Sequence, residues 1–276
     1  MNSAGYDNAP IAALAGLLGA LFAGTALAAP ITVINPGFED ISGEGVQNEF
    51  TFGALNGWDL YDPDGVAGTG TGGDYFIGTL TPQPDPGSPG DFINFPGGAL
   101  EGSRVGIAFA FVGNDVANGG GEYGFEQTLA ANLAANTRYE LSVGIGNIAS
   151  GNSLAAGFFN LDGFPGYRID LLAGGTVIAS DNNTLAGSIP EGEFRLTTVT
   201  FTSGASHAQL GEALGIRLVN LNVLDPAFPG ADLEVDFDNV QLSAVVVPLP
   251  AMAEHLKITP TWMALLIAGV VTVRRR

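Results

Sequence analysis

Apolar and polar residues alternate repeatedly along the middle of the chain. Between Arg138 and Val143, the apolar residues Tyr139, Leu141 and Val143 occupy every second position, and residues 196–201 repeat this alternation. Successive side chains of a β-strand point to opposite faces, so this pattern is typical of half-buried strands. Together with apolar runs between turn residues, it predicts strands at 31–35, 57–61, 74–80, 104–112, 123–129, 137–146, 167–173, 176–180, 194–202, 215–222 and 233–245.

Helical periodicity is scarce outside the two ends of the chain. Many short strands with turn-rich connections predict an all-β fold, a two-sheet antiparallel β-sandwich of the jelly-roll type, over residues 30–246. Residues 62–103 are the least regular part, with several Asp, Pro and Gly residues. Loops of this length in a compact domain are usually functional or disordered.

The first 29 residues have the composition of a secretory signal peptide. Residues 9–28 are mostly Ala, Leu, Gly and Ile, and Ala26 and Ala28 supply the small side chains that a cleavage site needs. Residues 1–8 depart from the pattern because they contain no Lys or Arg. A buried N-terminal helix is the alternative interpretation.

A second apolar segment lies at the C-terminal end. Residues 258–273 carry no charge, and three arginines follow them. The segment predicts a short transmembrane helix with a positively charged cytoplasmic end. An amphipathic core helix is the alternative. We therefore expect three parts: a signal helix at 1–29, the β-sandwich at 30–246 and a tail at 247–276.

The tail resembles the PEP-CTERM family of sorting signals in its Val-Pro-Leu-Pro-Ala variant. The resemblance rests on an ordered set of features, namely Val247, Pro248, Leu249, Pro250 and Ala251, the apolar segment, and Arg274, Arg275 and Arg276. It implies an exosortase-type processing enzyme, a transient stay in the inner membrane, and export to the cell surface or exopolysaccharide of a Gram-negative bacterium. The polar residues 254–257 depart from the family pattern by separating its two halves.

The charge balance and the absence of cysteine exclude several classes of function. The chain of 276 residues has a formal net charge of −19 and no cysteine. Thiol chemistry and disulfides are therefore excluded, and no basic surface for nucleic acid is expected. An acidic surface fits cation binding, and it equally fits plain adaptation to a salty exterior.

Several segments in order resemble the galactose-binding-like jelly-roll superfamily, which includes many carbohydrate-binding modules. They are residues 35–39 (Asn-Pro-Gly-Phe-Glu), 125–129 (Phe-Glu-Gln-Thr-Leu), 137–141 (Thr-Arg-Tyr-Glu-Leu) and 235–242 (Val-Asp-Phe-Asp-Asn-Val-Gln-Leu). The resemblance implies that the first and last strands lie together, with a structural Ca²⁺ held by Glu39 and Asp238. Asp236 lies two residues before Asp238, on the same face of a strand, and is a third candidate ligand. The alternative is that these carboxylates only accept hydrogen bonds.

Candidate ligand-binding and catalytic residues are sparse. The aromatic residues Tyr61, Tyr75 and Tyr123 could stack on sugar rings, although core packing is the alternative for each, and Trp58 is expected in the core. The predicted domain has one histidine, His207, and no Gly-x-Ser-x-Gly motif. We therefore expect a non-catalytic, glycan-binding module associated with extracellular polysaccharide. Two alternatives stay open: a matrix protein that self-associates through Ca²⁺, and a glycan hydrolase or lyase using a carboxylate pair such as Glu122 and Glu126.

Overall fold

The chain is all-β with antiparallel sheets, as the alternation pattern predicts. A computed structural model describes residues 27–42, 50–70, 75–82, 94–111, 121–153 and 157–247. Within this part of the chain every paired strand runs antiparallel to its neighbour. The predicted signal helix at 1–29 and the predicted membrane helix at 258–273 lie outside, or almost wholly outside, these ranges. The described residues form no helix long and apolar enough to cross a membrane.

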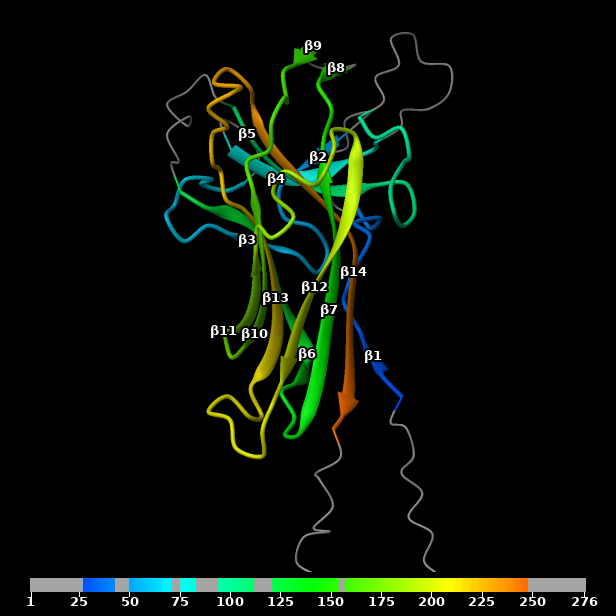
Figure 1. Ribbon diagram of the computed structural model, residues 1–276, viewed down its shortest axis with the longest axis vertical. Helices are drawn as coiled ribbons and strands as arrows, with labels where there is room; N and C mark the ends of the chain where they lie inside the picture. The colour runs from blue at the N-terminus through cyan, green and yellow to red at the C-terminus, as the bar shows by residue number, and fades with distance from the viewer. Residues whose placement is uncertain are drawn as a thin grey trace, which may run out of the picture.

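Two large sheets make up the body of the molecule (Figure 1). The seven-stranded sheet has the order β12 (Glu193–Thr202), β7 (Thr137–Asn147), β14 (Leu233–Val246), β5 (Val105–Ala110), β4 (Tyr75–Leu80) and β2 (Phe50–Phe52), and β1 (Ala29–Ile31) also pairs with β14. The five-stranded sheet has the order β11 (Thr176–Asn182), β10 (Tyr167–Ala173), β13 (Ala213–Asn220), β6 (Tyr123–Asn132) and β3 (Asp59–Tyr61). A separate hairpin joins β8 (Gly151–Ser153) to β9 (Gly157–Phe159) at one end.

The first and last strands lie together, as the jelly-roll resemblance implies. Ala29 pairs with Ala244 and Ile31 with Leu242. The start of the described chain and the end of β14 therefore lie at the same end of the molecule, and the β8–β9 hairpin lies at the opposite end (Figure 1).

The main core fills the space between the two sheets. Trp58 is fully buried, as predicted, and its ring stacks on Phe38 with a centroid distance of 5.4 Å. From the seven-stranded sheet, Val235 and Phe237 of β14 point into this core. Burial of such aromatic side chains supplies a large share of the favourable free energy of folding.

A second apolar layer covers the other face of the seven-stranded sheet. It contains Val105, Ile107 and Phe109 of β5 and Phe76 of β4, packed with residues from the loops. The sequence of β5 is apolar at every position, which is typical of a strand buried on both faces. Because of this second apolar layer, the part of the sheet that contains β4 and β5 is buried on both faces.

The structure also differs from the prediction in several elements. The strands β2, β8 and β9 are absent from the predicted set, and the first strand spans Ala29–Ile31, whereas residues 31–35 were predicted. Each missed strand has only three residues, which is too short for an alternation pattern to be recognised.

Candidate functional site

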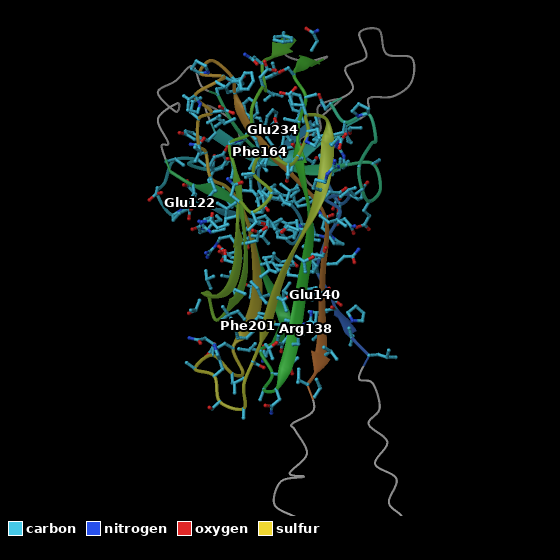
Figure 2. All side chains as sticks on the ribbon, in the orientation of Figure 1. Glu122, Arg138, Glu140, Phe164, Phe201 and Glu234 are labelled. Atoms are coloured by element: carbon cyan, nitrogen blue, oxygen red, sulfur yellow. The ribbon has the colours of Figure 1, made fainter. Side chains whose placement is uncertain are left out.

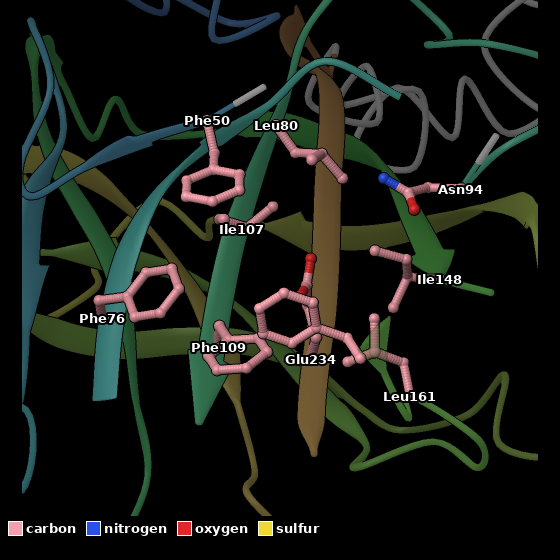
Figure 3. Close-up of a pocket in the computed structure, with 10 residues that line it drawn as sticks. Phe50, Phe76, Leu80, Asn94, Ile107, Phe109, Ile148, Leu161 and Glu234 are labelled. Carbon is pink, nitrogen blue, oxygen red and sulfur yellow. The ribbon is translucent and has the colours of Figure 1, made fainter. Parts of the chain in front are cut away.

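An apolar pocket lies within the second layer, on the face of the seven-stranded sheet away from the main core (Figure 3). It encloses a volume of about 50 Å³. Its lining comes from β2, β4, β5, β9 and β14 and the loops near them: Phe50, Phe76, Leu80, Asn94, Ile107, Phe109, Ile148, Phe159, Leu161 and Glu234. An aromatic wall with a few converging polar groups is the usual character of a small-molecule site.

Strand alternation places the aromatic wall. Ile107 and Phe109 occupy alternate positions of β5, and Phe76 on β4 lies directly opposite Phe109 in the register. The two phenylalanine rings stack with centroids 4.8 Å apart. Phe159, on the β8–β9 hairpin, meets Phe109 edge-on at 5.7 Å. The hairpin therefore covers the side of the pocket that lies opposite the seven-stranded sheet.

Glu234 brings a carboxyl group into this aromatic surrounding. Alternation along β14 sends Leu233, Val235 and Phe237 to the main core and turns Glu234 to the opposite face. Glu234 is 6% exposed, and its Oε1 has no hydrogen-bond partner among the described residues. Burial raises the pKa of Glu234 to about 8; the interaction with the Asp236 side chain opposes this shift, and the charge of Asp232 adds to it. The side chain therefore carries its proton at neutral pH.

Asp236 continues the same row of acids. It is fully buried, and neither of its carboxyl oxygens has a hydrogen-bond partner in the described part of the chain. Burial raises the pKa of Asp236 well above its usual range, and the neighbouring Glu234 acts in the same direction. Gly146 on β7 makes room here: a Cβ atom at Gly146 would lie 2.8 Å from the Asp236 Cβ and 2.6 Å from Cε1 of Phe194.

The two carboxylates predicted to hold calcium lie against one loop. Oδ2 of Asp238 accepts hydrogen bonds from the backbone N–H groups of Leu100 and Glu101, at 2.6 and 2.9 Å. Oε1 of Glu39 accepts from Ser103 and Arg104, both at 2.7 Å. Burial raises the pKa of Asp238 to about 6, although these amides oppose the shift.

These contacts bear on the predicted calcium site. Glu39 and Asp238 both accept hydrogen bonds from backbone N–H groups of residues 100–104. Asp236, the third predicted ligand, is fully buried beside Glu234. Among the residues that the structure describes, no group of three or more acidic or histidine side chains is placed to hold a metal ion. In this arrangement Glu39 and Asp238 are engaged by backbone N–H groups, and no step of the chemistry proposed below uses a metal ion.

The aromatic residues predicted to stack on a ligand have other roles. Tyr123 is fully buried and packs edge-on against Tyr75 with centroids 5.3 Å apart. Tyr61 donates a hydrogen bond to Glu122 at 2.8 Å and lies under the guanidinium of Arg217, 4.0 Å from its ring centroid. None of the three lines the pocket. Figure 2 places Glu122 and Glu234 in the upper half of the molecule, and the exposed pair Arg138 and Glu140 in the lower half.

Comparisons with known proteins show the family to which the chain belongs. The family model of the HpiC1-like proteins, described as HpiC1 cyclase, matches residues 29–243. The chain belongs to this HpiC1-like cyclase family. The matched residues include the whole of the described sandwich except its last few positions, and they include every residue that lines the pocket.

Solved structures agree with this family assignment. A cyclase from Fischerella sp. TAU is 36% identical, with 81% of this chain and 100% of that chain covered and a TM-score of 0.64. An apo-form cyclase from Fischerella sp. is 39% identical, with 80% and 98% covered and a TM-score of 0.63. A Stig cyclase from Fischerella sp. TAU, 36% identical with 80% and 100% covered and a TM-score of 0.63, was solved with (3Z)-3-(1-methyl-2-pyrrolidinylidene)-3H-indole. No curated protein matches the chain.

The family assignment corrects the functional prediction. The expectation of a non-catalytic glycan-binding module was wrong, because the family and the solved relatives are cyclases. The sequence analysis did not identify Glu234 or the aromatic wall of the pocket. It assigned Asp236 to a metal site and did not place it beside the pocket. The acids at alternate positions of β14 have the pattern of a solvent-facing row. The signal that could have revealed them is β5, whose continuous apolar run requires a cover on both faces.

Proposed function

We propose that this chain is a cyclase in which Glu234 donates a proton to promote ring closure of an apolar, unsaturated substrate. The observation that carries the proposal is a carboxyl group buried in an aromatic pocket, whose pKa of about 8 leaves it protonated at neutral pH. General acids work best when their pKa lies near the working pH. An ordinary exposed glutamate would be ionised under the same conditions.

The proposed step balances without an oxidant or reductant. Glu234 transfers its proton to an unsaturated carbon of the substrate, which leaves a neighbouring carbon positively charged. A nucleophilic carbon of the same molecule attacks that centre, and the new carbon–carbon bond closes the ring. The cyclic cation then loses a proton to the Glu234 carboxylate, which restores the acid. Substrate and product are isomers, and the ring faces of Phe76 and Phe109 favour the cationic intermediate.

The relatives indicate the substrate class. One Fischerella cyclase was solved with 4-(1H-indol-3-yl)butan-2-one and another with an indole derivative. We therefore propose an indole, or a related aromatic heterocycle with an N–H group, that carries an unsaturated side chain. Its aromatic and hydrocarbon surfaces match the apolar lining of the pocket.

The pocket must widen before such a substrate enters. A cavity of about 150 Å³ is enough for a benzene ring, whereas this pocket encloses about 50 Å³. The β8–β9 hairpin pairs only with itself in the described part of the chain, so no ladder hydrogen bonds to the large sheets oppose its displacement. We propose that movement of this hairpin, which carries Phe159, admits the substrate.

The test is turnover of 3-substituted indoles with unsaturated side chains, followed as an isomer of equal mass and altered chromatographic retention. We expect Glu234→Gln to reduce the rate by about a hundredfold or more, because the amide has no acid proton to donate. Glu140→Gln removes an exposed carboxylate far from the pocket and should leave the rate unchanged. Equal rates for Glu234→Gln and the wild type would remove Glu234 from the mechanism.

A structural Ca²⁺ stays a separate proposal. It would require Glu39 and Asp238 to exchange some of their backbone hydrogen bonds for the ion. If it binds the native state alone, millimolar Ca²⁺ should raise the unfolding midpoint relative to EDTA by very roughly 5 °C or more. The double variant Glu39→Gln with Asp238→Asn should lose the shift. An unchanged midpoint in the wild type would rule the ion out as a stabilising ligand.

Export and sorting also stay proposals. The motif at 247–251 and the terminal arginines fall outside the described residues, apart from Val247. We propose that an exosortase-type enzyme removes the tail after a transient stay in the inner membrane. The pairing of β1 with β14 places the two ends of the described sandwich at the end opposite the β8–β9 hairpin. The pocket entrance would then face away from the membrane.

A further inference from the structure

The pocket contains a second polar side chain that the proposed chemistry does not use. Among the described residues that line it, Glu234 and Asn94 are polar and the other eight are apolar. Asn94 is 5% exposed, and its Oδ1 has no hydrogen-bond partner in the described part of the chain. Figure 3 shows the amide of Asn94 and the carboxyl of Glu234 reaching the same space from different sides.

The position of Asn94 is fixed by its backbone. Its carbonyl oxygen accepts a hydrogen bond from the N–H of Ala149 at 3.4 Å, which ties the loop before β5 to the segment that follows β7. The side-chain oxygen takes no part in that bond. A buried acceptor without a partner is unfavourable for folding, and such groups in native proteins call for an explanation. A ligand that donates a hydrogen bond would supply the missing partner.

We propose that Oδ1 of Asn94 accepts a hydrogen bond from the N–H group of the substrate's aromatic heterocycle and so orients the substrate toward Glu234. The inference rests on the proposed function and adds a specificity determinant to it. Glu234 offers a donor and Asn94 an acceptor, so the pocket distinguishes the two ends of a substrate. A site built to bind an N–H group rejects an analogue that lacks it, because the buried acceptor then stays unpaired.

Two probes of nearly equal size isolate this hydrogen bond. In 3-methylindole the ring carries N–H, and in 3-methylbenzofuran an oxygen without a hydrogen takes its place. The experiment measures the dissociation constants of both probes by calorimetry for the wild type, Asn94→Leu and Asn182→Leu. Asn182 is an exposed residue at the end of β11 and does not line the pocket. It is the matched control.

We expect the wild type and Asn182→Leu to bind 3-methylindole at least tenfold more tightly than 3-methylbenzofuran. Asn94→Leu should bind the two probes about equally and should unfold at a higher temperature than the wild type, because it removes an unpaired buried acceptor. An asparagine that only supports the loop would not change the ratio between the probes.

Other results would overturn the inference in distinguishable ways. A tenfold preference that survives in Asn94→Leu, or no preference in the wild type, would refute the role of Asn94 and leave the acid chemistry of Glu234 standing. If neither probe binds the wild type, the measurement is repeated with Phe159→Ala, which enlarges the pocket. Absence of binding there as well would refute the aromatic N–H substrate class, and the role of Asn94 with it.

Discussion

Glu234 keeps a proton that an exposed glutamate would release, because eight apolar side chains surround it in the pocket lining. The same burial that makes it an acid makes its ionised form costly. Ionisation of Glu234 should therefore change both the catalytic rate and the free energy of unfolding with pH. The two effects can be measured separately.

The activity of the wild type should fall on the alkaline side of its pH profile. The proton donor is present below a pH of about 8 and is lost as Glu234 ionises. We expect kcat/KM for the indole substrates to decline about tenfold per pH unit above that value. A profile that stays flat to pH 10 would contradict a proton donor with this pKa.

The stability of the protein should depend on the same ionisation. The pKa of Glu234 is higher in the folded state than its ordinary value of 4.5, so the folded state binds the proton more tightly. The free energy of unfolding therefore falls as pH rises from about 4.5 to about 8, and the full penalty applies above this range. Glu234→Gln should be more stable than the wild type at pH 9, by up to about 4–5 kcal/mol, and nearly equal at pH 4. Urea unfolding at both pH values tests this, with Glu140→Gln as the control.

The strands β14 and β5 show how far sequence reasoning reaches at the level of single elements. The alternation of β14 was recognised correctly, and its apolar positions do face the main core. The burial of the opposite face of β14, where Glu234 and Asp236 lie, could not be deduced from that strand. The residues that cover this face come from loops and from three-residue strands. Long strands follow from local pattern, whereas the pocket depends on contacts between distant segments.

Gly146 on β7 offers a test of how tightly this second layer is packed. A methyl group there would lie 2.6 Å from the ring of Phe194 and 2.8 Å from the Cβ of Asp236. We expect Gly146→Ala to destabilise the fold by about 1–3 kcal/mol in thermal or urea unfolding. Gly204→Ala is the matched control, since its added methyl group would come no closer than 3.9 Å to any neighbour. Equal stability of the two variants would show that the second apolar layer can relax to accommodate the added methyl group.

The β8–β9 hairpin provides a second test at this scale. Phe159→Ala removes the ring that meets Phe109 and Phe111, so the pocket should become wider and easier to enter. We expect tighter or faster binding of 3-methylindole with modest loss of stability, because the hairpin lies outside both large sheets. Slower association in stopped-flow fluorescence would argue against entry past this residue.

At the scale of the whole chain, the processing predicted for its C-terminal tail can be followed by mass. If the tail is a sorting signal, protein purified from its native host should lack the residues beyond about Pro250. Intact-mass spectrometry checks this directly, and the chain expressed in a host without an exosortase-type enzyme is the control. A full-length C-terminus on the mature native protein would contradict the assignment.

The place of β14 has a consequence for the order of folding. Among the described strands it is the last to be synthesised, yet in the seven-stranded sheet it separates β7 from β5 and also pairs with β1. The sheet cannot close around a nascent chain that lacks this strand, so productive folding must wait until residues 233–246 are available. Glu234 and Asp236 therefore become buried only when this strand joins the sheet. A truncation before β14 should yield a chain without a closed sheet and without a reaction centre.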